Sequence, residues 1–186
     1  MVFISIFFIL LGSVTLDNEY SNFYKRIKNH KKSKMILQKD VIIFVDYSKP
    51  ITEKRLHVLD NKKRVILASY HVGHAFNTGD LIAKNFSNRK NSRKSSLGLF
   101  RLLSEYDSRF FEYSYRIEGL DKTNSNAFVR GVVIHEQGDE PGVIFASKSK
   151  ARFYQLLTDG CFSLFPGDLV ELSHYLKPGV LILAVI

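Results

Sequence analysis

The residues best suited to chemistry in this chain are its single cysteine and a histidine 26 positions earlier. Cys161 follows Gly160 in a polar segment, and His135 ends the apolar run Val132–Val133–Ile134. A thiol becomes an effective nucleophile when a neighbouring base removes its proton. Backbone N–H groups beside a glycine can then hold the oxyanion that the attack creates. The pair therefore predicts covalent catalysis by Cys161 with His135 as its base, provided that the two meet in space.

Both residues also have a structural interpretation. A lone cysteine is commonly a buried and inert core residue. A histidine that closes an apolar strand often only marks the point where the strand reaches the surface. The polar neighbours Thr158, Asp159 and Ser163 are unusual for a deep core, so they favour a working thiol.

No metal or cofactor site is predicted. His71 and His74 are three positions apart, which in an extended segment places them on opposite faces. The chain has no second cysteine, no H-E-x-x-H motif and no glycine-rich nucleotide motif. The other histidines, His30, His57 and His174, are predicted to lie at the surface.

The elements that must position the two residues are predicted to be β-strands. Apolar, β-branched and aromatic runs are typical of strands, and they occur at 41–47, 55–60, 64–70, 99–103, 113–117, 132–135 and 180–186. Residues 61–63 join two of them as a hairpin, the last run is expected at the centre of the sheet, and 168–175 is expected to be a short helix. With no helical run between the first three strands, we expect an antiparallel, mainly β core. Residues 71–98 are rich in Gly, Asn and Ser and are predicted to form a long loop, of a length that is usual for functional or disordered segments.

The first forty residues differ from the rest of the chain. Residues 1–16 are apolar but shorter than the roughly 20 residues that span a membrane, so they predict a secretory signal or an N-terminal anchor. The alternative is a buried strand or helix. Residues 17–40 are basic with aromatic residues at helical spacing, which favours a solvated linker helix over a polyanion-binding arm. Residues 41–186 are predicted to form one folded domain.

Composition narrows the classes of partner. With 45% hydrophobic residues among 186, the chain is not wholly disordered. A formal net charge of +9 predicts an anionic partner, which could be nucleic acid, a membrane or a bacterial wall. The basic stretch 87–98 lacks interleaved aromatic residues, so it offers no platform for stacking bases and argues against nucleic acid.

Several blocks in the second and later thirds of the chain resemble, in order, the motifs of a known family. They are HAFNTG at 74–79, FSN at 86–88, SRKSSLG at 92–98, GLDKTNSNA at 119–127, VIHE at 133–136 and TDGCF at 158–162. This pattern is similar to that of the L,D-transpeptidase (YkuD-like) family, specifically its murein L,D-transpeptidase catalytic-domain subgroup. The resemblance runs from about Val41 to the C-terminus.

The resemblance implies a mainly β fold, an L,D-transpeptidase-like β-sandwich or barrel with one or two short helices and long cleft-lining loops. It implies that Cys161 attacks a peptidoglycan stem peptide with His135 as base, forms a thioester, expels D-Ala and passes the acyl group to an amine or to water. The N–H groups of Gly160 and Cys161, with Thr158 nearby, would hold the oxyanion. The residues implied at the substrate are His74, Asn77, Ser95, Ser96, Gly98 and Glu136.

The chain departs from the family pattern at four positions. Ala75 and Glu136 replace glycines, Thr158 stands for serine and Phe162 for proline. Glu136 either narrows the cleft or stabilises an imidazolium beside the thiolate, and the sequence leaves both open.

The resemblance also implies a location and leaves rival functions. We expect export to the bacterial periplasm or cell envelope, with an anionic cell-wall surface as partner and a membrane contact only through an uncleaved N-terminal segment. No nucleic-acid partner and no cofactor are expected. The alternatives to transpeptidation are L,D-carboxypeptidase or endopeptidase hydrolysis of the same peptides, and a catalytically weak homologue that binds the cell wall.

Overall fold

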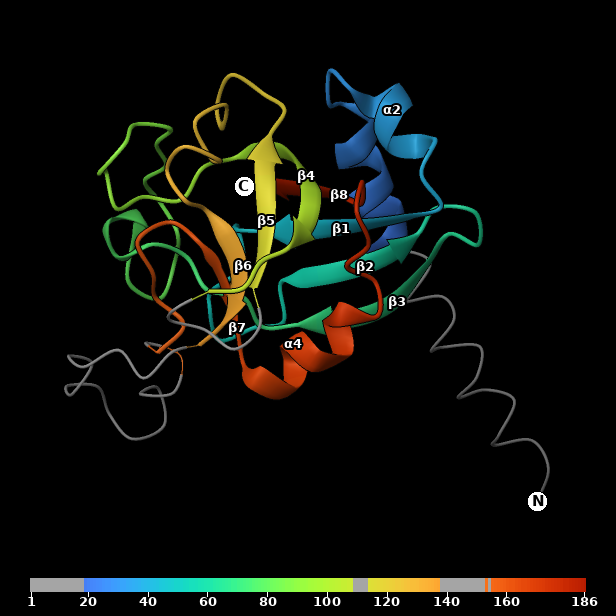
Figure 1. Cartoon of the computed structure of the whole chain (residues 1–186). Coiled ribbons are helices and arrows are strands. Elements are labelled where there is room, and N and C mark those ends of the chain that lie inside the picture. The colour runs from blue at the N-terminus through green and yellow to red at the C-terminus, as the bar shows by residue number, and fades with distance from the viewer. Residues whose placement is uncertain (1–18, 109–113, 138–152, 154) are drawn as a thin grey trace.

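The computed structural model describes residues 19–108, 114–137, 153 and 155–186, and these are built on one sheet of eight strands (Figure 1). The strands are β1 (Val41–Asp46), β2 (Leu56–Asp60), β3 (Val65–Tyr70), β4 (Gly98–Glu105), β5 (Ser114–Gly119), β6 (Val133–Glu136), β7 (Phe162–Leu164) and β8 (Leu181–Val185). Their order is β3-β2-β1-β8-β4-β5-β6-β7. The sheet twists strongly, so that β5 runs almost across the direction of β1 in Figure 1. The predicted mainly β fold is confirmed.

The sheet is mixed, although we expected an antiparallel one. β1 pairs with β8 in parallel, and β6 pairs with β7 in parallel, while the other neighbours are antiparallel. Parallel neighbours need a long crossover connection, which the hairpin pattern of the first three strands could not reveal. The expected antiparallel core is therefore wrong for these two pairs. The predicted hairpin at 61–63 and the central position of the last strand are both confirmed.

Two cores lie on opposite faces of the central strands. On β1, Ile43 faces a core that is closed by α4 (Pro166–Ser173), whereas Phe44 faces a second core closed by helical residues 19–28 and α2 (Ser33–Leu37). Figure 1 shows α4 and α2 on opposite sides of the sheet. Because β1 and β8 are covered on both faces, their sequences are apolar without alternation.

The N-terminal helical residues belong to the packed structure. Tyr20, Phe23 and Ile27 are at most 4% exposed, and all three join the second core. The expectation of a solvated linker is therefore wrong for this face of the helix. The ring of Phe23 also covers His57, with 4.6 Å between ring centroids, so this histidine is buried where a surface position was predicted. The helical spacing of Tyr20, Phe23 and Ile27 indicated an apolar face, but the many basic residues between them favoured a solvated helix.

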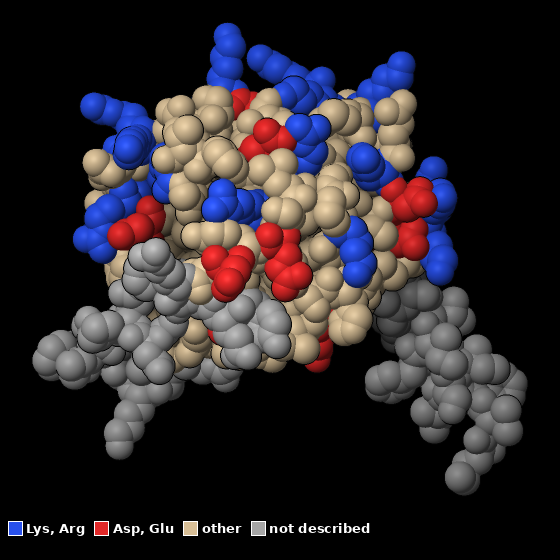
Figure 2. Space-filling model, viewed as in Figure 1, with Lys and Arg blue, Asp and Glu red and all other residues tan. Residues whose placement is uncertain are grey.

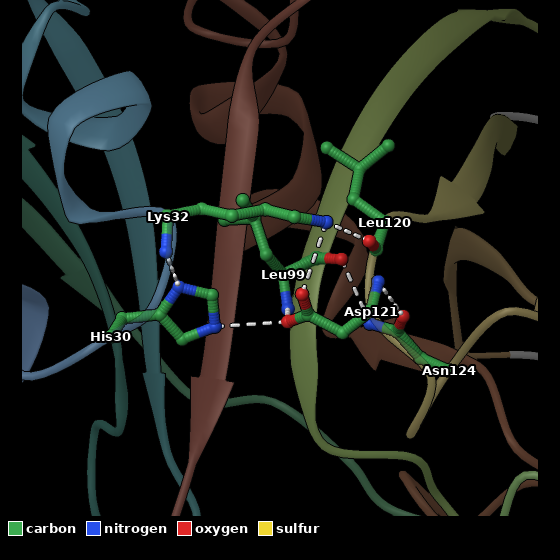
Figure 3. A network of polar contacts seen from close by, with 6 residues as sticks. All are labelled: His30, Lys32, Leu99, Leu120, Asp121 and Asn124. Atoms are coloured by element: carbon green, nitrogen blue, oxygen red, sulfur yellow. Dashed lines mark hydrogen bonds and ion pairs between the residues drawn. The ribbon is translucent and has the colours of Figure 1, made fainter.

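A polar network fastens the N-terminal segment to the turn that follows β5 (Figure 3). His30 Nε2 lies 2.9 Å from the Asp121 carboxylate, and Lys32 Nζ lies 3.2 Å from its other oxygen. The same carboxylate accepts the Leu99 N–H at 2.7 Å, while Asn124 donates to the Leu99 carbonyl at 2.9 Å. Asp121 thus joins the N-terminal segment, β4 and the turn in one cluster, and these contacts keep its pKa low against the effect of burial.

Charge is distributed rather than concentrated on the face shown in Figure 2, where basic side chains surround the rim with acidic ones between them. None of the helices in the described ranges is long and apolar enough to cross a bilayer. The predicted signal or anchor at 1–16 lies outside the described residues, as does Tyr113, the first residue of the predicted strand at 113–117.

Candidate active site

Parallel pairing of β6 with β7 places the predicted nucleophile and base on neighbouring strands. His135 on β6 pairs with Ser163 on β7, and Cys161 lies two positions before Ser163. Continuing this register places Cys161 beside Val133. Because side chains alternate along a strand, Cys161 and His135 fall on the same face, on neighbouring strands, with their Cα atoms about 8 Å apart from standard strand spacings. A thiol and an imidazole can meet across that separation.

The thiol of Cys161 is held in a protonated state in the free protein. Its Sγ lies 3.7 Å from the carbonyl oxygen of Gly131, and the residue is only partly exposed. Burial raises the pKa of Cys161 to about 11, against the lowering effects of a hydrogen bond from the Val133 backbone and of the charge on Arg130. Because only the thiolate attacks, this thiol needs a base.

His135 has the properties of such a base. It is 4% exposed, and burial lowers the pKa of His135 to about 4, so the ring is neutral at physiological pH. Its Nδ1 lies against the carbonyl oxygen of Glu136. Since a carbonyl can only accept, Nδ1 carries the proton and Nε2 carries the lone pair that a general base uses. The side chain of Glu136 is itself partly exposed.

The turn before the cysteine is closed by a side chain. Gly160 has φ +145°, which favours glycine, and its N–H donates to the hydroxyl of Thr158 at 3.0 Å. That hydroxyl donates in turn to the carbonyl oxygen of Cys161 at 3.1 Å. The Gly160 N–H was expected to hold an oxyanion, but here Thr158 already occupies it. The N–H of Cys161 is the remaining candidate from the predicted pair.

The block that contains His74 supports this turn from the interior. His74 is fully buried, with Nδ1 2.8 Å from Arg55 and Nε2 3.0 Å from the Gly79 carbonyl. Its backbone carbonyl accepts the Thr158 N–H at 3.0 Å, and the Phe76 N–H donates to the Thr158 carbonyl at 2.8 Å. The structure therefore places His74 behind the site, where it positions Thr158, rather than on the surface that a substrate would meet.

The other predicted cleft residues separate into different environments. Ser95 and Ser96 are buried, and the Ser95 hydroxyl accepts the Ala75 N–H at 3.0 Å. Asn77 is exposed. Gly98 has φ +117°, and a Cβ at this position would lie 2.8 Å from the Asp121 carboxylate, so its absent side chain makes room for the turn after β5. Gly98 is thus grouped with the N-terminal network and not with the thiol.

Arg130 is a site residue that the sequence did not reveal. Its guanidinium donates to the Ser87 carbonyl at 2.9 Å and to the Ser96 hydroxyl at 2.6 Å. A Cβ on Gly160 would lie 3.0 Å from the same guanidinium. Arg130 thereby ties the loop at 87–96 to the turn that carries Cys161, and its charge opposes the rise in the thiol pKa. It lies between two recognisable motifs, so no pattern indicated it.

A cavity of about 300 Å³ opens beside the thiol. Its described lining consists of Tyr106, Ser108, Arg116, Ile117, Phe128, Gly131, Val132, Val133 and Cys161. His135 is not in this lining, because it lies two residue pairs further along the strands and is buried. Cys161 thus borders the cavity, whereas His135 lies outside its described lining.

Metal ligands do not gather in the described ranges, where three or more His, Cys, Asp or Glu side chains nowhere form a cluster that could hold an ion. His71 Nδ1 lies 4.0 Å from Asp168, whereas His74 contacts Arg55. The two histidines thus have separate partners, and the groups that remain as candidates for chemistry are Cys161 and His135.

Comparison with known proteins identifies a family match. A family model described as the L,D-transpeptidase catalytic domain matches residues 14–184, a stretch that includes the packed N-terminal helix. No curated protein matches the sequence. Among solved structures, the helical cell shape determining protein Pgp2 from Campylobacter jejuni is similar at 13% identity and a TM-score of 0.51, covering 78% of this chain and 47% of that one. This likeness shows a shared fold.

Two further structures are similar at lower scores. One is an L,D-transpeptidase from Mycobacterium smegmatis, at 12% identity and a TM-score of 0.46, covering 79% of this chain and 59% of that one. The other is an L,D-transpeptidase from Enterococcus faecium, at 14% identity and a TM-score of 0.47, covering 79% of this chain and 50% of that one. The chain spans about half the length of the solved proteins that it matches.

Proposed function

The chain belongs to the L,D-transpeptidase catalytic-domain family, and from this premise we propose that it is a cysteine-dependent acyltransferase acting on peptidoglycan stem peptides. The parallel pairing of β6 with β7 carries the proposal, because it sets His135 two residue pairs along the strands from Cys161, on the same face of the sheet. A thiol and a neutral imidazole in that relation are the nucleophile and base of acyl transfer.

The proposed reaction has two halves. The Sγ of Cys161 bonds to the scissile carbonyl carbon while Nε2 of His135 takes the thiol proton, and the Cys161 N–H stabilises the oxyanion. The carbon–nitrogen bond then breaks, the imidazolium returns its proton to the leaving amine, and D-Ala departs from the thioester. An amine from a second stem peptide attacks the thioester and gives a proton to His135, the carbon–sulfur bond breaks, and His135 passes that proton to the departing sulfur, which restores the thiol.

The raised pKa of the Cys161 thiol and the lowered pKa of His135 determine how the first half proceeds. In the free protein both groups are neutral, so no resting thiolate waits for the substrate. Proton transfer must accompany attack on the carbonyl. Arg130 assists at that moment, because its positive charge favours the sulfur when it carries negative charge.

A proposed location accompanies the activity. Residues 1–16 act as an export signal or anchor, and the domain at 41–186, with its basic lead-in at 17–40, faces the anionic cell wall of the periplasm or envelope. The net charge of +9 supports this partner. No nucleic acid and no cofactor are involved.

A second candidate, a catalytically weak homologue that binds the wall, is favoured by one observation. The Gly160 N–H is engaged by Thr158, which leaves one fewer donor for an oxyanion. Hydrolysis of the same peptides, as an L,D-carboxypeptidase or endopeptidase, differs from transpeptidation only in the acceptor.

The test is to incubate the full chain with purified stem tetrapeptides and follow both the protein and the peptides by mass spectrometry. We expect a thioester at Cys161, release of D-Ala and, with an amine acceptor, a cross-linked product. Cys161→Ala should abolish all three. Water as sole acceptor, traced with ¹⁸O, would instead identify a hydrolase. Binding to sacculi without any thioester would favour the weak homologue and contradict the acyltransferase.

A further inference from the structure

We propose that Arg116 is an anion anchor in the cavity beside Cys161 and binds a carboxylate of the donor peptide. This inference rests on the proposed function for the identity of the peptide.

The sheet register places Arg116 in line with the thiol. Arg116 on β5 pairs with Val133 on β6, and the register of β6 with β7 sets Cys161 beside Val133. The three residues therefore form one row across adjacent strands, with their side chains on one face. Two strand spacings separate the Cα atoms of Arg116 and Cys161 by about 10 Å. A peptide residue of about 3.5 Å together with the long arginine side chain spans that distance.

Two aromatic rings hold the guanidinium in place. Its Cζ lies 4.1 Å from the ring centroid of Tyr106 and 5.9 Å from that of Phe128. Contacts with ring faces orient a guanidinium while leaving its N–H donors at the edge. Arg116 is partly buried, so a partner would meet these donors where water screens them less.

Arg116 has no acidic partner among the described residues, in contrast to three other arginines of the chain. Arg101 on the adjacent strand β4 pairs with Glu118, Arg26 lies 2.5 Å from Asp46, and Arg93 lies 2.5 Å from Asp159. A guanidinium that is oriented by aromatic rings, faces a cavity and donates to no side chain or carbonyl of the described residues is suited to an anionic ligand.

The rest of the cavity favours a peptide carboxylate. Ile117, Val132, Val133 and the ring of Phe128 make its described wall largely apolar. A volume of about 300 Å³ is at the small end of ligand sites, enough for the few atoms around one scissile bond. Apolar walls with one cation near the nucleophile match a short peptide that carries a carboxylate close to the bond being broken.

Two carboxylates of a donor peptide meet this description. One is the terminal carboxylate of the residue that leaves, and the other is a side-chain carboxylate of the residue that becomes the thioester. The chemistry at Arg116 is the same for both, and amidation of one or the other in a synthetic donor separates them.

The experiment compares wild type, Arg116→Gln and Arg116→Lys, with Arg101→Gln as the matched control on the neighbouring strand. Each is given the free stem tetrapeptide and two forms amidated at one carboxylate only. For the free peptide we expect Arg116→Gln to lower kcat/KM by roughly tenfold to hundredfold, the range of one charge-assisted hydrogen bond, mainly through KM. Arg116→Lys should recover part of this loss, and Arg101→Gln should match wild type.

The amidated donors identify the carboxylate and expose a merely structural role. Amidation of the anchored carboxylate should lower the kcat/KM of wild type by the same factor as Arg116→Gln lowers it for the free peptide. The variant should show no further loss of kcat/KM with that amidated peptide. Equal losses by Arg116→Gln on all three peptides, or no loss at all, would overturn the anchor.

Calorimetric binding of the same peptides separates this inference from the proposed function. Peptide binding that depends on Arg116, without a Cys161 thioester, would support the anchor and contradict the acyltransferase. A Cys161 thioester that forms while neither peptide binding nor KM depends on Arg116 would support the acyltransferase and contradict the anchor. Thermal melts of each variant show that it is folded.

Discussion

The hydroxyl of Thr158 accepts the backbone N–H of Gly160 at 3.0 Å, and so closes the turn immediately before the nucleophile. The same hydroxyl donates to the carbonyl oxygen of Cys161 at 3.1 Å. The Thr158 side chain thus holds both the Gly160 N–H and the Cys161 carbonyl, the backbone groups on either side of the nucleophile. Serine, the residue in the family pattern, carries the same hydroxyl, so its replacement by threonine preserves this function.

We predict that Thr158→Val loosens the turn. Both hydrogen bonds disappear while the side-chain size is nearly kept, so the free energy of unfolding should fall by about 1–2 kcal/mol. The rate of Cys161 acylation should fall about tenfold, since the turn no longer holds the cysteine amide toward the oxyanion. Thr158→Ser should retain both values. Denaturant titration and acylation kinetics measure the two effects, and a Thr158→Val protein equal to wild type in both would refute the assignment.

Arg130 should influence the thiol through its charge. Because the Arg130 guanidinium lowers the pKa of Cys161, Arg130→Gln should raise that pKa further and slow alkylation by iodoacetamide at neutral pH several-fold. The substitution also removes the donors to Ser87 and Ser96, so a thermal melt must accompany the rate. Arg101→Gln, which alters an exposed arginine paired with Glu118, is the control and should leave the alkylation rate unchanged. An unaltered rate in Arg130→Gln would remove Arg130 from the site.

The pH dependence of the free thiol should be displaced from that of an ordinary cysteine. Burial raises the pKa of Cys161 to about 11, so alkylation should keep rising with pH until about that value, beyond the 8.5 that is usual for cysteine. Acylation by substrate should behave differently, because His135 with a pKa of about 4 is already neutral above that pH and able to accept the proton. We therefore expect kcat/KM to be lost only as pH falls toward 4. A thiol that titrates near 7 would contradict the neutral pair.

The sequence was most informative where a local pattern determines the structure. The apolar runs of β1 and β8 predicted buried strands because both faces of these strands are covered, and the short motifs located Cys161 and His135. The sequence was least informative about relations between distant segments. The parallel pairing of β6 with β7 and the alignment of Arg116 with Cys161 depend on register across strands, which no single motif encodes.

The roles of individual residues within the motifs were also harder to predict than their presence. His74 lies in a recognisable block, yet its ring is buried against Arg55 and only its backbone contacts Thr158. The Gly160 N–H was expected to hold an oxyanion and instead bonds to the side chain two positions earlier. In both cases a competing hydrogen bond inside the fold, invisible in a linear pattern, decides the outcome.

Gly73 lies in a tightly packed position behind the site. A Cβ there would lie 1.8 Å from the Leu156 carbonyl oxygen and 2.2 Å from the Ser163 hydroxyl, and Ser163 is the strand neighbour of His135. Gly73→Ala must therefore displace backbone, and we expect it to lower the free energy of unfolding by about 2–3 kcal/mol and to impair acylation as well. Gly167→Ala is the matched control: no atom lies within 4 Å of its Cβ position, and alanine suits the helix α4, so its stability should equal or exceed that of wild type. Equal stabilities of the two variants would contradict this packing.

Three buried histidines should make the protein sensitive to acid. Burial lowers the pKa of His57, His74 and His135 to about 4 each, whereas a histidine in the unfolded chain titrates near 6.5. Between these values the unfolded chain binds more protons, so their contribution to stability is complete above about pH 6.5 and is lost as pH falls toward 4. The slope should reach about 4 kcal/mol per pH unit for the three together. His57→Gln, remote from the thiol, should reduce this slope by about one third. Urea unfolding from pH 5 to 7 measures these slopes, and a wild-type free energy of unfolding that stays flat across this range would show that the three histidines are not buried as neutral rings.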